Sequence, residues 1–210
     1  MIRKLIIMTI LILNSLSGYA QKSEETLVRK TFDNYKASIL NDKGSDAVKC
    51  VDSRTIRYYS EMLHKTKNAD SSSVNSLGLM DKLMVFSIRH RATKKDILSF
   101  NGKDLLIFAI KEGMVGKNSV AKNIVGDIVI DGKFAKGQLI ADGQKTPFYF
   151  HFYKEEGIWK IDLTSLLPIG EVAFRNMQQS SGMSENQYLF KLLEMTTGKK
   201  PGSDIWAKIK

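Results

Sequence analysis

Apolar and polar residues alternate between Thr146 and Leu163, and this alternation predicts two β-strands joined by a tight turn at Lys154–Gly157. We predict that Tyr153 pairs with Ile158, because a slip of one residue would mix the two faces. One face of this hairpin is then apolar, with Phe148, Phe150, Phe152, Trp159 and Ile161. The opposite face carries Tyr149, His151 and Tyr153.

Two further strands precede this hairpin. Residues 124–130 and 133–141 flank Asp131-Gly132, a dipeptide typical of tight hairpin turns. In the predicted register Asp127 lies opposite Lys136 and forms a cross-strand ion pair with it. A turn at 142–145 leads into the Phe148 strand, so the pattern predicts a four-stranded antiparallel meander.

Helical periodicity dominates the rest of the chain. Ser23 followed by two glutamates predicts a helix start, and Val28, Phe32, Tyr35 and Ile39 form its apolar stripe. Further helices are predicted at residues 45–51, from 52 or 53 onward, and at 74–90, 93–100, 168–181 and 184–197. Residues 105–110 fit a buried helix or strand, and Lys111-Glu112-Gly113 favours the helix. The predicted fold class is α+β, with N-terminal helices packed on a curved antiparallel sheet and two additional C-terminal helices.

The first 20 residues have the pattern of a secretory signal peptide. Arg3 and Lys4 precede an apolar run too short to span a bilayer comfortably, and Gly18-Tyr19-Ala20 resembles a cleavage site. We expect an exported protein, periplasmic or secreted, with no transmembrane segment after cleavage. Residues 21–166 would form the α+β domain, and residues 167–210 a helical extension on the same domain. Because residues 1–20 hold two basic groups and no acidic one, the net charge falls from +10 to +8.

Candidate chemistry is sparse. Cys50 stands alone in an apolar segment, which favours a structural thiol, and His64, His90 and His151 are too far apart for zinc-ligand spacing. We therefore predict no metal, no cofactor and no catalytic residue. The basic cluster Arg89, Arg91, Lys94 and Lys95 is interpreted as a solvated helix end, and export makes nucleic acid an unexpected partner.

Helices followed by an antiparallel meander that ends in Gly157-Ile-Trp159-Lys-Ile161 resemble the nuclear transport factor 2-like superfamily, which includes ketosteroid isomerase and polyketide-cyclase-like domains. The helix at residues 26–40 and Tyr58-Tyr59 also carry the resemblance. It implies a cone-shaped α+β fold with a cavity between the first helix and the sheet. The candidate ligand-binding residues in that cavity are Phe32, Tyr35, Phe148, Phe150, Phe152 and Trp159.

Three functions remain open from the sequence. The first is a non-enzymatic domain that binds a small apolar ligand or a protein partner. The second is an isomerase- or cyclase-like enzyme, which requires an acid or histidine buried in the pocket. The third is an interaction module that forms a homodimer through Tyr149, His151 and Tyr153.

Overall fold

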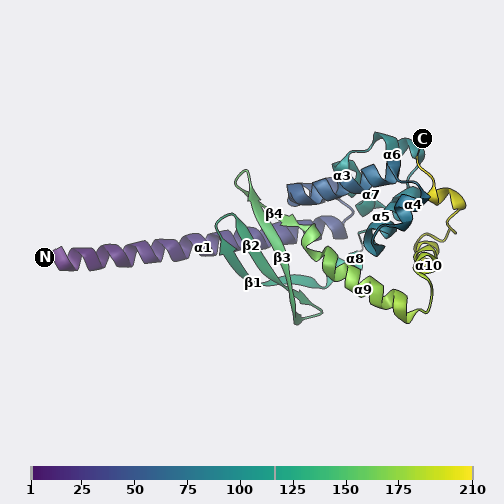
Figure 1. Cartoon of the computed structure of the whole chain (residues 1–210). Helices are drawn as coiled ribbons and strands as arrows, with labels where there is room; N and C mark the ends of the chain where they lie inside the picture. The colour runs from purple at the N-terminus through teal and green to yellow at the C-terminus, as the bar shows by residue number, and fades with distance from the viewer. Residues whose placement is uncertain (1, 116, 210) are drawn as a thin grey trace.

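The computed structural model describes the backbone of residues 2–115 and 117–209, and the side chains of residues 21–115, 117 and 120–209. It is an α+β fold in which helices pack on a four-stranded antiparallel sheet with strand order β1-β2-β3-β4 (Figure 1). The strands are β1 (Asn123–Asp131), β2 (Phe134–Ala141), β3 (Gln144–Glu155) and β4 (Ile158–Asp162). The predicted fold class and meander are confirmed.

Helices α1 to α8 precede the sheet, and two further helices follow it. Their bounds are α1 (Ile2–Leu40), α2 (Gly44–Cys50), α3 (Ser53–Asn68), α4 (Ser71–Asn75), α5 (Leu79–Arg91), α6 (Lys94–Ser99), α7 (Gly102–Lys111), α8 (Lys117–Ala121), α9 (Leu167–Ser180) and α10 (Glu185–Thr197). Short 3-10 helices lie at η1 (Leu163–Leu166) and η2 (Ser203–Trp206). The ambiguous segment 105–110 is helical, as predicted.

Two predicted helix boundaries are wrong. Helix α1 runs through Ser23 without a start there. The helix predicted at residues 74–90 is divided, because α4 ends at Asn75 and extended Gly78 begins α5. The signal-peptide prediction rests on side chains outside the described residues.

The register of both outer hairpins differs by two residues from the prediction. Glu155 pairs with Ile158, so the β3–β4 turn consists of Glu156 and Gly157 alone, both with positive φ (50° and 81°). A two-residue turn of this kind matches the strand twist better than the predicted four-residue turn. A shift of two residues keeps every side chain on its predicted face, because the side-chain period of a strand is two.

The predicted Asp127–Lys136 ion pair is also wrong. The β1–β2 turn consists of Gly132 and Lys133, and Val129 lies opposite Lys136. A bulge between Val125 and Ile128 shifts the register again. Asp127 instead pairs with Lys145, with 2.7 Å between Oδ2 and Nζ.

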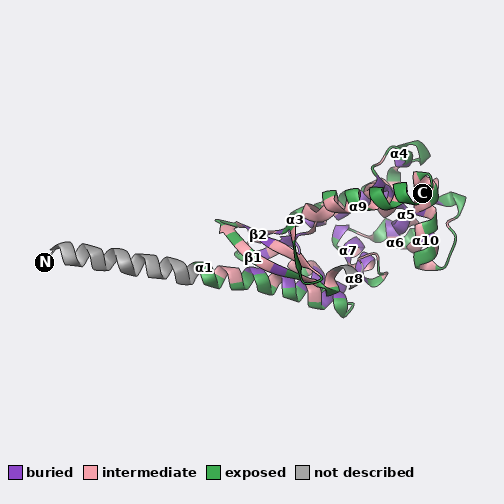
Figure 2. Cartoon of the chain, turned by 90° about the horizontal axis from the view of Figure 1, so that it is seen from below, coloured by how far each residue is buried: buried purple, intermediate pink, exposed green. Residues whose placement is uncertain are grey.

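Helix α1 packs across the inner face of the sheet and is bonded to both of its edges. Arg29 donates to the carbonyl oxygens of Val125 and Gly126, next to the bulge. At the opposite edge, Thr31 Oγ1 donates to the carbonyl oxygen of Trp159 over 3.1 Å. Figure 2 shows buried residues along the sides of α1 and the sheet that face each other. These bonds satisfy strand carbonyls that the ladder leaves free.

A second apolar cluster lies at the end of the molecule away from the sheet, where α5 packs against α10 and the C-terminal segment. Phe86 of α5 contacts the Trp206 ring, with centroids 4.8 Å apart. The helix predicted at residues 184–197 is confirmed as α10, which begins at a capping box between Ser184 and Gln187 and is followed by the C-cap Gly198. Helix α9 connects the sheet to this cluster and has no buried residue (Figure 2).

Candidate functional site

Five of the six predicted cavity residues are part of the packed core. The exposed fractions are 1% for Phe32, 3% for Tyr35, 4% for Phe150, 0% for Phe152 and 2% for Trp159. The rings of Phe32 and Phe150 contact each other with centroids 4.7 Å apart. These side chains therefore occupy the space between α1 and the sheet themselves. Phe148 does not join them, since 39% of it is exposed.

The outer face of the sheet, which we define by Phe134, Lys136, Tyr149, His151 and Tyr153, is only partly covered. The register places Phe134 opposite Tyr153 and Lys136 opposite His151. The Phe134 ring lies 5.3 Å from the His151 ring and 5.2 Å from the Tyr153 ring, centroid to centroid. The structure thus brings the three predicted interface residues together on one surface and adds Phe134. Phe134 could have been identified from the sequence only by pairing β2 with β3 in the correct register, which places it opposite Tyr153.

Cations lie over the tyrosines of this face. The Arg54 guanidinium carbon is 3.5 Å from the Tyr153 ring centroid, and Lys136 Nζ is 5.3 Å from the Tyr149 centroid. His151 lies opposite Asp162, where the predicted register had placed Lys160. Attraction between these cations and the ring faces helps to hold the two tyrosine rings in place at the surface.

Two carboxylates, those of Asp52 and Asp162, are buried beside this face. The alternation of residues alone does not predict burial of Asp162, which lies on the more polar face of the hairpin. Asp52 is fully buried, and its Oδ1 accepts a 2.9 Å hydrogen bond from the Thr55 amide at the start of α3. Asp162 is 5% exposed and accepts bonds from the Thr164 amide (2.9 Å) and hydroxyl (2.6 Å). Both acids cap helices, so their burial has a structural explanation that requires no proton-transfer role.

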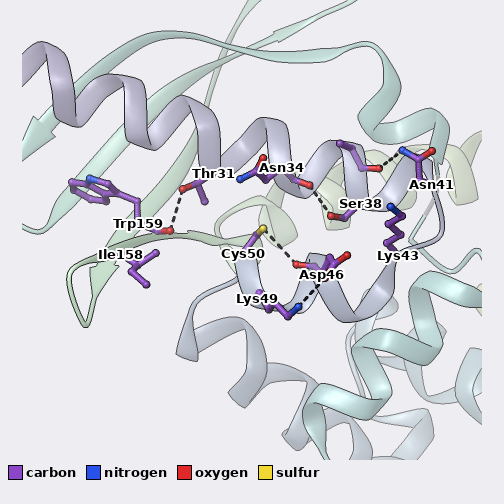
Figure 3. A pocket seen from close by; sticks show the side chains of 11 residues that line it. Thr31, Asn34, Ser38, Asn41, Lys43, Asp46, Lys49, Cys50, Ile158 and Trp159 are labelled. Carbon is purple, nitrogen blue, oxygen red and sulfur yellow. Dashed lines mark hydrogen bonds and ion pairs between the residues drawn. The ribbon is translucent and has the colours of Figure 1, made fainter.

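A groove of about 480 Å³ lies between α1, α2 and β4 (Figure 3). Most of its polar side chains are already bonded within the chain: Ser38 Oγ to the Asn34 carbonyl oxygen, Asn41 to that of Ala37, and Lys49 to Asp46. The groove therefore offers few free polar groups that could orient a ligand.

Cys50 lies in the same groove and is partly buried. Burial raises the pKa of its thiol, so that the thiol form is favoured over the reactive thiolate. Its Sγ also donates to the Asp46 carbonyl oxygen over 3.6 Å (Figure 3). The thiol has the surroundings expected of a structural cysteine.

The basic cluster at the end of α5 is not simply a solvated helix end. Arg89 donates to the carbonyl oxygens of Thr66, Ala69 and Ile205, and so joins α3, α5 and the C-terminal segment. Burial lowers the pKa of the Arg89 guanidinium. Lys94 and Lys95 are exposed. Arg91 donates to the carbonyl oxygen of Glu112, which follows α7, over 3.1 Å. Both arginines, which were expected in solvent, therefore help to join helices, because their guanidinium groups reach carbonyl oxygens left free at helix ends.

Among the described side chains, no group of three or more His, Cys, Asp or Glu is arranged to hold a metal ion. Within the same part of the chain, no helix has both the length and the apolarity needed to cross a membrane. Comparison with family models, characterised proteins and solved structures gave no match for this chain. The resemblance to the nuclear transport factor 2-like superfamily stays a prediction.

Proposed function

We propose that this chain is an exported, non-enzymatic binding domain, and that a protein partner docks on the outer face of the sheet. The observation that carries this proposal is the contrast between the two faces. The inner aromatic residues are buried under α1, whereas Tyr149 is 38% exposed and its neighbours Phe134, His151 and Tyr153 are half-buried. Aromatic residues held rigidly at a surface are typical anchors of protein interfaces.

The packed interior favours a protein partner over a small apolar ligand. A ligand between α1 and the sheet would have to separate Phe32 from Phe150, whose rings are in contact. Displacing buried rings costs several kcal/mol, since a Phe to Ala change alone costs about 3–5 kcal/mol. Docking on the outer face requires no such rearrangement.

Photo-crosslinking tests the proposal. Benzoylphenylalanine at Tyr149 should give one discrete product in the exporting cell, and the same group at Val172 of α9 should not. Val172 is a matched control because 60% of it is exposed on another element. A product of twice the chain mass would identify a second copy, which light scattering of the purified protein would confirm. Identical products at both positions, or no discrete product at Tyr149, would refute the docking surface.

A further inference from the structure

A pocket of about 370 Å³ lies at the corner where α3 meets the ends of two hairpins. Helix α3 contributes Ser53, Arg54 and Arg57. The β1–β2 turn contributes Lys133, and the end of β3 contributes residues 153–155. The lining thus holds four cations, the fourth being Lys154, and one carboxylate, Glu155.

The one carboxylate is bound by the start of α3. Glu155 accepts hydrogen bonds from the Ser53 amide at 3.0 and 3.2 Å, and from the Ser53 hydroxyl at 2.6 Å. A carboxylate at a helix N-terminus is stabilised by the helix dipole and by free amide groups. Among the described residues, Glu155 forms no ion pair with the pocket's cations. Arg54 and Lys154 pair with acids outside the lining, so within the described part of the chain Arg57 and Lys133 are the two pocket cations without an ion-pair partner.

Two of the cations are fixed in place. Arg54 is stacked on Tyr153, and its Nη1 lies 3.1 Å from Asp52 Oδ2. Lys154 Nζ lies 2.7 Å from a carboxylate oxygen of Glu24. Each of these cations is anchored by an acid outside the pocket lining. Holding a side chain in its bound position in advance reduces the entropy lost on binding.

The other two cations are free. Arg57 and Lys133 are exposed, and neither has a hydrogen-bond or ion-pair partner among the described side chains. The backbone carbonyl of Lys133 accepts a 2.8 Å bond from the Lys154 amide, which fixes the turn beside β3. Two unpaired cations therefore share one pocket with two positioned ones. Such an arrangement favours a ligand with several negative oxygens, and the arginine fork suits planar or tetrahedral oxyanions.

We propose that this pocket binds the oxyanion group, phosphate or carboxylate, of a small ligand. The pocket adjoins the outer face and shares Tyr153 with it, but its two unpaired cations, Arg57 and Lys133, lie outside that face as defined above. Binding should weaken as ionic strength rises, since the contributing cations are largely exposed.

NMR titration of the purified protein tests this site, with inorganic pyrophosphate and citrate as separate probes. Saturable amide shifts are expected for residues 53–57, 133 and 153–155. Arg57→Gln and Lys133→Gln should each weaken binding of the preferred probe about fivefold, and Arg57→Lys should retain part of the affinity. A preference for pyrophosphate would assign a phosphate ligand, and a preference for citrate a carboxylate ligand.

Lys95→Gln is the matched control, because Lys95 is an exposed lysine of α6 that does not line this pocket. It should leave both affinities unchanged. Shifts spread over lysines throughout the chain, or equal weakening by all three glutamine variants, would show non-specific charge attraction and overturn the proposal. A failure here would leave the Tyr149 cross-linking result unaffected, so the two proposals fail separately.

Discussion

Replacing Asp52 by alanine should destabilise the protein strongly, although Asp52 touches no proposed ligand. Its side chain is fully buried and accepts from the Thr55 amide at 2.9 Å. Loss of a helix cap costs about 1 kcal/mol, and leaving a buried donor unpaired costs about 1–3 kcal/mol more. We therefore expect a loss of about 2–4 kcal/mol in the free energy of unfolding.

Asp70 provides a matched control for this change. It caps α4 with the same geometry, accepting from the Ser73 amide at 2.9 Å, but it lies in solvent. Water can replace the lost acceptor there, so Asp70→Ala should cost less than half as much as Asp52→Ala. Asp52→Asn keeps an acceptor for the Thr55 amide and should recover about 1 kcal/mol.

Urea unfolding followed by circular dichroism at 222 nm measures all three variants. The slope of free energy against urea must stay constant for the comparison to hold. Equal losses for Asp52→Ala and Asp70→Ala would refute the reasoning, because Asp52 differs from Asp70 in its burial and in its 3.1 Å contact with Arg54, and both differences predict the larger loss at Asp52. Full stability of Asp52→Ala would show that the cap is dispensable and would reopen a functional role for this acid.

Three further predictions use equally simple measurements. Gly102→Ala should cost about 1–3 kcal/mol of unfolding free energy, because the added Cβ atom would lie 2.7 Å from the carbonyl oxygen of Ile56 in α3. Gly78→Ala should cost little, because a Cβ atom added there would have no neighbouring atom within 4 Å. Hydrogen bonds from Lys154, the larger cause, and from Trp159 lower the pKa of Glu24, so the contribution of Glu24 to stability is present above about pH 4.5 and is lost as the pH falls below that value. The melting temperature of Glu24→Gln should therefore fall less on acidification than that of the unaltered chain. Equal falls in melting temperature would contradict this role of Glu24. Phe152→Ala should cost about 3–5 kcal/mol and Phe148→Ala clearly less, since the exposed fractions are 0% and 39%; equal losses in urea unfolding would show that Phe148 belongs to the core.

Several elements follow directly from local sequence. The capping boxes at Thr93 and Ser184 and the end of α10 at Gly198 depend only on residues within one helical turn. The faces of β3 follow from alternation, and for this reason they survive the two-residue error in register. The local sequence pattern is therefore sufficient to predict the fold class, the two faces of the strands and many of the helix ends.

Features that depend on distant residues could not be predicted. Asp127 pairs with Lys145 because a bulge shifts the register of β1 against β2, and no local sequence pattern predicts that bulge. Likewise, the four cations of the α3 pocket come from three parts of the chain. Their juxtaposition depends on how the hairpins meet α3.

Tertiary packing also decided between a cavity and a filled core. The sequence determined that Phe32, Phe150 and Phe152 face inward, because their spacing matches the helix and strand periods. Only the distance between α1 and the sheet could decide whether these rings line a space or occupy it. Arg29 and Thr31 bond α1 to the sheet edges, and at that separation the rings of Phe32 and Phe150 are in contact. Periodicity fixes the direction of a side chain, whereas the spacing of packed elements depends on all the contacts between them.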